Sequence, residues 1–227
     1  MAVSRLSIIV PVLNEAAGIE SCLTSLAGLR AAGCEVIVVD GGSGDETPTR
    51  AAPGCDRLLR SARGRATQMH AGATVARADL LLFLHADTRL PLGALDAIEA
   101  ATHGRKFGWG RFDVRLDSTR ASLRLVATMM NLRSRVTGIA TGDQALFMTR
   151  AAYAAAGGYP AIALMEDIAI SKQLKRRCAP ACLRLKVLTS ARRWESRGVL
   201  ATIVLMWRLR LAYFFGASPE SLARRYR

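Results

Sequence analysis

Polar side chains follow three apolar runs of the sequence, each at the point where its run ends. They are Asn14, Glu15, Asp40, Ser43, His85 and Asp87. Because the carboxyl ends of parallel strands border the ligand crevice of an α/β sheet, we expect these side chains to converge on one crevice. One strand followed by an acid and a turn is mostly structural, whereas three in succession favour a binding or catalytic site.

Two of these carboxylates suit different parts of a nucleotide ligand. Asp87 is a hard oxygen ligand for Mg²⁺ or Mn²⁺, which keep several waters and bridge substrate phosphates. Asp40 can accept hydrogen bonds from a ribose or a base, and the three glycines of residues 41–44 let a ligand approach the backbone closely. A tight turn with Asp45 as a helix N-cap is the structural alternative for this loop.

Basic residues in two further segments suit a diphosphate. In "RSARGRATQ", Arg63 and Arg65 flank a glycine at the start of an expected helix, where guanidinium groups and free backbone amides bind phosphates. In "SARRWE", Arg192 and Arg193 form a cationic pair beside the aromatic ring of Trp194. Solvated arginines in the first segment, and a basic loop anchored by one tryptophan in the second, are the structural alternatives.

The second half of the chain supplies two neighbouring acids, Glu166 and Asp167, in "LMEDIAISKQL". Acids at a helix start are stabilised by the helix dipole whatever their function, so capping is favoured for the pair taken alone. A like charge beside a carboxyl group in a dry pocket can instead raise its pKa toward the range of a general base. Gly142 and Asp143, in "TGDQALF", are the other candidates in this half.

The elements that must position these residues alternate between strands and helices in the first half of the chain. Buried β-branched runs predict strands, and apolar residues at helical spacing predict helices. The strands are expected at 5–15, 34–40, 57–61 and 78–87, and the helices at 15–33, 45–52 and 64–76. This order predicts an α/β fold with a mostly parallel sheet and right-handed crossovers.

After residue 105 the pattern changes. Residues 109–117 alternate polar and apolar side chains, which is typical of a half-solvated strand. The next elements are expected as a helix at 118–138, a strand at 143–150, a helix at 166–177 and a strand at 181–194. The apolar segment 198–216 carries Arg208 and Arg210, and its uncharged run is shorter than the about 20 residues that span a bilayer. We predict a buried helix, with a helix on a membrane surface as the alternative.

The composition limits the partners and the compartment. The 227 residues are 51% apolar, enough for one large domain with a sizeable core. The net charge of +14, with arginine as 28 of the 32 basic residues, attracts anionic lipid, nucleic acid or phosphorylated small molecules, unless it reflects genomic base composition. The basic residues are spread out among few aromatics, so nucleic acid is not an expected partner. Five cysteines without a CxxC pair, and no signal peptide, favour a cytoplasmic protein with reduced thiols.

The order of motifs resembles the family 2 glycosyltransferases of GT-A fold. The segments that carry the resemblance are "SIIVPVLNE", "VIVVDGGSGDET", "ADLLLFLHADT", "GDQALF", "MEDIAIS" and "ARRW", over roughly residues 5–195. The segments "RGRATQMHAGA" and "SPESLARRYR" are most similar to a small bacterial subgroup, the radical-SAM/selenodomain-associated glycosyltransferases of arsenosugar-biosynthesis type. The resemblance implies a GT-A domain over 1–195, with a nucleotide-sugar half (1–104) and an acceptor and catalytic half (105–195), followed by a helical tail at 196–227.

The resemblance also implies a reaction and a set of binding residues. Such enzymes move a sugar from a nucleotide-diphosphate donor to a hydroxyl acceptor, a small molecule or a lipid-linked one, and invert the anomeric centre in one displacement with Mg²⁺ or Mn²⁺. The positions that match the donor site are Pro11, Asn14, Glu15, Asp40, Ser43, Arg63, Arg65, Ala86, Arg193 and Trp194. The positions that fall on the acceptor side are Gly142 and Asp143.

The catalytic and metal positions follow from the same resemblance. Asp167 matches the base that deprotonates the acceptor, with Glu166 beside it. Asp87 matches the last residue of the metal-binding DxD motif. His85 replaces the first Asp of that motif, and either binds the metal or forms a hydrogen bond with a group that does. We expect Asp40, Asp87 and Asp167 to meet around one cation and its diphosphate.

Two other classes of protein remain open from the residues alone. A sugar-nucleotide nucleotidyltransferase would carry a glycine-rich, basic loop after its first strand, where this chain has "PVLNEAAG". A non-enzymatic module that binds nucleic acid or anionic membrane is suggested only by charge. If the tail helix is not buried, the alternative for the enzyme is peripheral contact with the inner membrane through the tail, in the manner of interfacial helices, and the same apolar tail can supply a homodimer contact.

Overall fold

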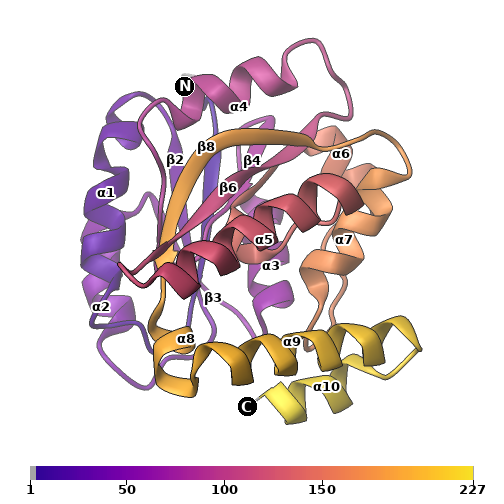
Figure 1. Cartoon of the computed structure of the whole chain (residues 1–227). Helices are drawn as coiled ribbons and strands as arrows, with labels where there is room; N and C mark the ends of the chain where they lie inside the picture. The colour runs from indigo at the N-terminus through magenta and orange to yellow at the C-terminus, as the bar shows by residue number, and fades with distance from the viewer. Residues whose placement is uncertain (1–3, 227) are drawn as a thin grey trace.

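The computed structural model describes residues 4–226 as one mixed sheet of eight strands with helices packed on it (Figure 1). The strands are β1 (Ser7–Val12), β2 (Glu35–Asp40), β3 (Arg57–Arg60), β4 (Leu80–Phe83), β5 (Thr88–Arg89), β6 (Trp109–Asp117), β7 (Leu146–Thr149) and β8 (Ala181–Ser190). Their order across the sheet is β3-β2-β1-β4-β7-β6-β8-β5. Strands β3, β2, β1 and β4 are parallel, as are β6 and β8, whereas β7 and β5 run antiparallel to their neighbours.

Helices cover both faces of the sheet. They are α1 (Ile19–Ala31), α2 (Thr47–Ala51), α3 (Arg65–Val75), α4 (Ala94–Thr102), α5 (Ala121–Thr137), α6 (Arg150–Ala155), α7 (Glu166–Lys175), α8 (Arg192–Arg197), α9 (Val199–Phe214) and α10 (Pro219–Tyr226), with 3₁₀ turns at Ala52–Gly54 and Gly142–Gln144. Ile8 of β1 packs in a core with α1, α4 and α5, and Ile9 packs in a second core with α3, α6 and α7. Burial on both faces confirms the predicted α/β fold and explains the unbroken apolar run of β1.

The carboxyl ends of β1 and β2 are held together by a buried side chain of α3. The amide Nε2 of Gln68 donates hydrogen bonds to the carbonyl oxygens of Val12 and Val39, both at 2.8 Å. A Cβ on Gly41 would lie 2.9 Å from Gln68, and one on Gly72 would lie 2.5 Å from Ile9, so both glycines permit close packing. The loops that follow these strands therefore start from a rigid edge.

The prediction of a half-solvated strand at 109–117 holds only for the end of the strand, where residues 115 and 117 are exposed and residue 116 is buried. Strand β6 is buried at every residue from 109 to 114, including Arg111 and Asp113. These two side chains form an ion pair, and Arg135 Nη2 donates to Asp113 Oδ2 at 2.6 Å. The charges of this strand are thus paired inside the fold, which an alternating pattern alone cannot distinguish from exposure to water.

Three local predictions also differ from the structure. Helices α4 and α6 were not predicted. The strand predicted at 181–194 ends at Ser190, and residues 192–197 form α8. The preference for a buried tail helix is wrong, since only Thr202 and Leu209 of α9 are buried and Trp207 is 73% exposed.

The helical tail, predicted over 196–227, lies across the carboxyl ends of the strands. In Figure 1, α8, α9 and α10 line the lower edge of the molecule, and α8 follows the end of β8. Leu209 and Leu222 of the tail pack with Met165 and Ile168 at the start of α7. Within residues 4–226, no helix combines the length and the apolar character needed to cross a membrane. The outermost residues of the two predicted domains, 1–3 and 227, lie outside the described part of the chain.

Candidate functional site

The loops after β1 and β2 are tied to each other by side-chain hydrogen bonds. The amide of Asn14 donates to Ser43 Oγ at 2.9 Å, and the amide of Gly44 donates back to Asn14 Oδ1 at 2.9 Å. Asp40 accepts from the amides of Gly42 and Ser43 at 3.0 and 3.1 Å and from the Ser43 hydroxyl. The predicted donor-site residues Asn14, Asp40 and Ser43 thus build one loop scaffold.

For the loop after β2, the structural alternative of a tight turn stabilised by Asp45 also holds in part. Asp45 Oδ1 accepts from the amide of Thr47 at 3.0 Å, and Asp45 Oδ2 accepts from the amide of Ala16 at 3.2 Å. The N-cap position of α2 is Glu46, so Asp45 stabilises the turn one residue earlier than expected. Pro11 lies in β1 opposite Val39, beyond the last β1–β4 pair at Ile9, where its missing N–H costs no hydrogen bond to β4.

A cavity of about 370 Å³ opens beside the loop after β1. Its lining includes the acids Glu15, Asp87 and Asp117 and the bases Arg89 and Arg192. Arg192 Nη2 of α8 lies 3.7 Å from Glu15 Oε2, and burial, together with the nearby charge of Asp87, raises the pKa of Glu15. The predicted residues Glu15 and Asp87 are therefore brought together, and Ala86 lines the same cavity.

His85 faces the second half of the chain. Its Nδ1 lies 3.3 Å from Asp143 Oδ1, and its buried Nε2 has no hydrogen-bond partner among the described residues. A Cβ on Gly142 would lie 2.5 Å from this Nε2, so only glycine allows the imidazole to approach so closely. Partial burial opposes ionisation of Asp143, but the hydrogen bond from His85 and the charge of Arg65 outweigh it and lower the pKa of Asp143.

The two acids at the start of α7 also contact the residues around His85 and Asp143. Asp167 Oδ2 accepts from the amide of Gly142 at 3.0 Å, and Arg65 Nη1 lies 3.8 Å from Glu166 Oε1. Glu166 is 5% exposed; burial, and then the like charge of Asp167, raise its pKa. The contacts Arg65–Glu166, Asp167–Gly142 and His85–Asp143 thus join α3, the loop after β4, the 3₁₀ turn and α7 in one site.

Unusual backbone geometry marks this site. Three non-glycine residues between 4 and 226 have positive φ: Asn14 at 54°, Ala145 at 47° and Met165 at 70°. Asn14 lies in the loop after β1, Ala145 follows the 3₁₀ turn, and Met165 precedes α7. Residues held in this sparsely populated region persist where the surrounding contacts determine the conformation, and they concentrate at functional sites.

The remaining predicted donor-binding residues lie at the edge of the candidate site. The guanidinium of Arg193 stacks on Tyr226, with Cζ 4.4 Å from the ring centroid. Trp194 is partly buried against the core that includes α1, α4 and α5, so it anchors α8 as the structural alternative proposed. Arg63 is exposed on the loop before α3 and takes no part in the contacts described above.

The expectation that Asp40, Asp87 and Asp167 surround one cation is wrong. In the described part of the chain, no three His, Cys, Asp or Glu residues are placed to hold a metal ion together. Asp40 is turned into its own loop, and Asp167 is turned toward Gly142. The cavity with Glu15 and Asp87 still fits Mg²⁺ or Mn²⁺, because these ions are held by one or two carboxylates together with substrate phosphates and water.

Sequence reasoning missed three residues close to this site. Gln68 joins the ends of β1 and β2, and Arg133 of α5 and Arg210 of α9 bring buried guanidinium nitrogens without hydrogen-bond partners among residues 4–226. The sequence feature that could have identified Arg210 is its charge within an apolar segment. Nothing in the pattern of α5 distinguishes Arg133 from its exposed neighbours.

The raised pKa of Glu166 predicts a pH-dependent effect on stability. Since its pKa is higher in the folded chain than the usual 4.5, Glu166 stabilises the fold below about pH 4.5 and loses that contribution as pH rises through the raised value. Glu166→Gln, neutral at every pH, should therefore raise Tm at pH 7.5 and change it little near pH 4. Thermal unfolding at both pH values measures this, with the exposed Glu20→Gln as control. A lower Tm at pH 7.5 would mean that the Arg65 contact outweighs burial.

Comparison with known proteins places these features in a family. The family described as Glycosyl transferase family 2 matches residues 7–152. The PGL/p-HBAD biosynthesis glycosyltransferase of Mycobacterium bovis (strain BCG / Pasteur 1173P2) is 40% identical over 97 residues, which cover 40% of this chain and 38% of that protein. An uncharacterized protein of Mycobacterium tuberculosis is 37% identical over 99 residues and is covered to 31%. The chain thus spans less than two fifths of the length of these curated relatives.

Solved structures share the fold at low identity. The mannosyltransferase PcManGT from Pyrobaculum calidifontis, in complex with GDP-Man and Mn²⁺, has a TM-score of 0.67 and 18% identity, over all of this chain and 70% of that one. Glucosyl-3-phosphoglycerate synthase from Mycobacterium tuberculosis, in complex with Mn²⁺, UDP and glucosyl-3-phosphoglycerate, has a TM-score of 0.57 and 20% identity, over 80% of this chain and 70% of that one.

The sheet, and the position of the site at its strand ends, define the class of the protein as a GT-A fold. The chain belongs to glycosyl transferase family 2. The family match ends before α7 and α8, so Glu166, Asp167 and Arg193 lie outside the matched residues.

Proposed function

We propose that the chain is an inverting glycosyltransferase that moves a sugar from a nucleotide-diphosphate donor to a hydroxyl acceptor. The observation that carries this proposal is the joined set of contacts Arg65–Glu166, Asp167–Gly142 and His85–Asp143, next to the carboxylate cavity at the strand ends. Family membership supports transfer of a sugar, and the GDP-Man, UDP and Mn²⁺ named for two structures of the same fold support a nucleotide-sugar donor and a divalent ion.

The donor is assigned to the loops after β1, β2 and β4. The exposed Asn14 loop and the glycines beside Asp40 leave room for a nucleoside, with Pro11 and Ser43 next to it. Arg65 and Arg193, whose charges both act on Asp143, are assigned to the diphosphate, with Arg63 on the approach and Trp194 anchoring α8. Glu15 and Ala86 border the cavity that receives the sugar-diphosphate end of the donor.

A divalent ion is assigned to Asp87. The exposed carboxylate of Asp87 shares its cavity with Glu15. Donor phosphates and water would supply the other ligands of the ion, which suits Mg²⁺ or Mn²⁺. When bound, the ion neutralises negative charge that develops on the leaving diphosphate. His85 faces Asp143, so we assign it to holding the Gly142–Asp143 turn rather than to the ion.

The transfer step is a single displacement. The acceptor oxygen forms a bond to the anomeric carbon while the bond from that carbon to the diphosphate oxygen breaks, and the nucleoside diphosphate leaves with the electron pair. The acceptor proton passes to Asp167, with the acceptor lying against the Gly142 turn. Attack from the face opposite the leaving group inverts the anomeric centre. Glu166, whose pKa is raised beside Asp167, is placed to hold its neighbour in position.

The motifs of the sequence support a narrower assignment within the family. The segments "RGRATQMHAGA" and "FLHADT" form the Arg65 helix start and the His85–Asp87 loop of the proposed site. We therefore assign the chain to the radical-SAM/selenodomain-associated subgroup of arsenosugar-biosynthesis type. We propose that the chain acts in the cytoplasm on a small or lipid-linked acceptor.

Binding calorimetry tests the proposed function. UDP-, GDP- and dTDP-sugars are titrated into the full chain with Mg²⁺, with Mn²⁺ and with chelator. At least one donor should bind in the presence of the cation and much more weakly in chelator. Binding of a nucleoside triphosphate and a sugar phosphate, with release of pyrophosphate, would identify a nucleotidyltransferase instead. DNA retention that is lost at high salt, without any nucleotide-sugar binding, would identify a binding module.

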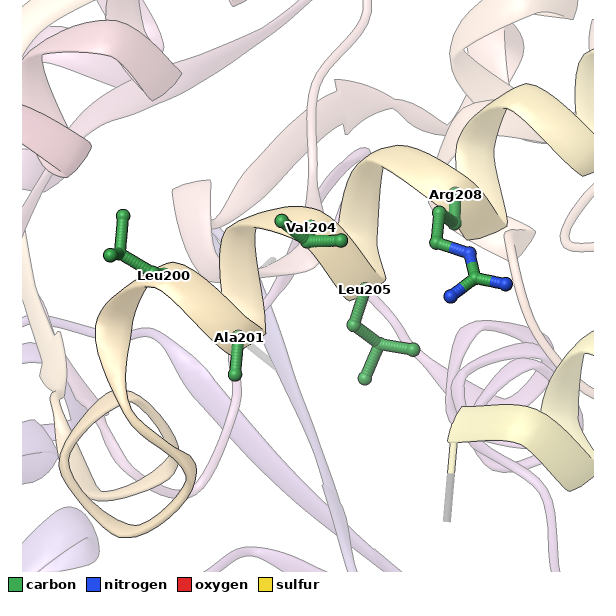
Figure 2. Close-up of a pocket in the computed structure, with 5 residues that line it drawn as sticks. All are labelled: Leu200, Ala201, Val204, Leu205 and Arg208. Atoms are coloured by element: carbon green, nitrogen blue, oxygen red, sulfur yellow. The ribbon is translucent and has the colours of Figure 1, made fainter.

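One surface of the tail supports a place for the enzyme at the membrane. The exposed apolar side chains of α9 and the residue after it are Leu200, Val204, Trp207, Leu211, Phe214 and Phe215. Figure 2 shows Leu200, Val204 and Arg208 along α9, where a groove of about 400 Å³ is lined almost entirely by apolar side chains. Helix α5, which packs against the same core as α9, adds four exposed apolar residues between 125 and 136.

The charge of the surface formed by α5 and α9 indicates the kind of partner that it binds. Of the arginines of α5 and α9, Arg124 and Arg208 are exposed and not engaged with an acid, and neither helix contains an acidic residue. A surface with apolar side chains between arginines is complementary to an anionic lipid bilayer, where the apolar groups enter the interface and the guanidinium groups meet the headgroups. We therefore place the enzyme on the inner membrane, with α9 in the plane of the interface.

Vesicle flotation tests this placement. Trp207→Ser with Phe214→Ser should weaken binding to phosphatidylglycerol-containing vesicles by about 10-fold or more, because each large apolar side chain contributes about 1.5–3 kcal/mol when buried. Leu92→Ser is the control, since Leu92 is 97% exposed beside α4, at the opposite edge of the molecule. Equal binding of the double variant and wild type contradicts the placement. A dimer in sedimentation that the double variant abolishes, without vesicle binding, assigns the surface to a second copy.

A further inference from the structure

Three arginines outside the proposed donor site carry buried donors that nothing in the described chain accepts. Arg111 is paired with Asp113, whereas Arg133 and Arg210 form no ion pair among the described residues. Arg133 lies on α5 and Arg210 on α9. Nε and Nη2 of Arg133 and Nε of Arg210 are buried and have no hydrogen-bond partner among residues 4–226, and only Nη1 of Arg133 is seen to donate, to the carbonyl of Ile139 at 3.2 Å. Buried N–H donors are nearly always satisfied in folded proteins, so these atoms call for an acceptor.

The contacts of these residues place them beside Asp167. Ile139, which accepts from Arg133, packs with Met165, Ile168 and Leu209, at the start of α7 and next to Arg210. The chain then runs through the Ala140 amide, which donates to Ser171 of α7, to the Gly142 amide that donates to Asp167. The two guanidinium groups therefore lie on the side of the site where the proposed function puts the acceptor.

The charges of the pair are not balanced by a carboxylate contact. No ion pair joins Arg133 or Arg210 to an acid in the described residues, although the more distant charge of Asp167 favours the charged form of both. Burial, and then the charge of Arg210, lower the pKa of Arg133 to about 10, so the group remains a cation at neutral pH. Two like charges held together in a partly dry place are stabilised by a bound anion.

The donor diphosphate does not account for these residues. The cavity with Glu15 and Asp87 lies on the side of β5 and β8 and is not lined by Arg133 or Arg210. The diphosphate already has Arg65 and Arg193 in the proposed function. We therefore attribute Arg133 and Arg210 to a second anion-binding site, on the acceptor side.

We propose that Arg133 and Arg210 bind a phosphate group of the acceptor and thereby present its hydroxyl to Asp167. This inference rests on the proposed function for the identity of the ligand as an acceptor, but not for the binding of phosphate. Planar guanidinium groups donate two parallel hydrogen bonds to a phosphate, a geometry that a lysine does not reproduce. The phosphate belongs either to a soluble phosphorylated hydroxy compound or to a lipid phosphate at the surface formed by α5 and α9.

Phosphate titration of the full chain tests the proposal. Inorganic phosphate and glycerol phosphate are followed by ³¹P NMR line broadening, with wild type, Arg133→Gln and Arg210→Gln. The matched controls are Arg124→Gln on α5 and Arg208→Gln on α9, which remove the same charge from exposed positions of the same helices. Each buried-arginine variant should weaken phosphate binding by about 10-fold or more, and each control by less than about twofold.

A second arm distinguishes the source of the phosphate. Vesicles of phosphatidylcholine with phosphatidic acid replace the soluble phosphates, and the same variants are compared. Loss in Arg133→Gln and Arg210→Gln only with the vesicles assigns the phosphate to a lipid, and loss with the soluble compounds assigns it to a small acceptor. If a Gln variant does not fold, Arg133→Lys and Arg210→Lys, which keep the charge, should still bind more weakly than wild type.

Two results would overturn the inference. One is equal phosphate binding by all five proteins, or by none of them, with both probes. The other is an equal loss in the buried and the exposed variants with the soluble phosphates, which marks general charge attraction. Donor titration separates this failure from that of the proposed function, because Arg133→Gln should bind the nucleotide-sugar with wild-type affinity whether or not phosphate binding is lost.

Discussion

Asp167→Asn is expected to lower the rate of sugar transfer by about 10²- to 10⁴-fold, the usual contribution of a general base, while the Kd of the donor stays within about twofold of wild type. The asparagine amide cannot accept the acceptor proton. Its oxygen can keep one of the two hydrogen bonds that Asp167 receives from the amides of Gly142 and Ile168, so the turn should stay in place. Release of nucleoside diphosphate, followed under single-turnover conditions, measures the effect.

The control for this variant is Asp79→Asn, an exposed acid at the opposite end of β4. Wild-type turnover of Asp167→Asn would remove the residue from the chemistry. If Glu166→Gln loses turnover and Asp167→Asn keeps it, Glu166 and not Asp167 is the general base. A parallel loss of donor binding would mean that Asp167 acts on the donor and not on the acceptor.

Asp87→Ala is expected to abolish the dependence of donor binding on the divalent ion. The other acids of the cavity are Glu15 and Asp117. The carboxyl group of Glu15 has a raised pKa and an Arg192 contact, so we do not expect it to replace the lost ligand. Calorimetric affinity for the nucleoside diphosphate with Mn²⁺ should fall by about 10²-fold or more, to the value of wild type in chelator. The affinity for the nucleoside alone should not change.

Asp79→Ala serves as the control for charge. If Asp87→Ala keeps a normal Mn²⁺-dependent affinity, the ion is held elsewhere. If the variant also loses binding of the nucleoside without phosphates, Asp87 has a structural role in the loop between β4 and β5, where its carbonyl accepts from the amide of Ser190.

The sequence predicts the parts of this molecule that depend on local patterns. The β1, β2 and β4 runs are buried on both faces, and continuous apolar sequence is sufficient to identify such strands. Since their carboxyl ends meet at one edge, the convergence of the β1 and β4 loops near one cavity also followed from the pattern. The GT-A fold and the family were accessible because several weak motifs occur in the right order.

The parts that sequence reasoning missed depend on which partner each side chain finds in the folded chain. Strand β6 is polar in sequence but buried, because Asp113 receives both Arg111 and Arg135. Asp40 satisfies its own loop, so the three predicted carboxylates do not surround one ion. The tail helix is apolar all round, yet one side rests on α7 and the other is exposed, and only tertiary packing decides which side is which.

The central claim is that a nucleotide-sugar and a divalent ion meet at Asp87, at the carboxyl ends of the strands. Anomalous diffraction from crystals grown with Mn²⁺ and the tightest-binding nucleoside diphosphate tests it most directly. We predict one manganese peak within coordination distance of an Asp87 carboxylate oxygen and of the diphosphate, with the nucleoside beside Asn14 and Asp40. A nucleotide bound in another part of the molecule, or a manganese ion that contacts the diphosphate without Asp87, would contradict the account.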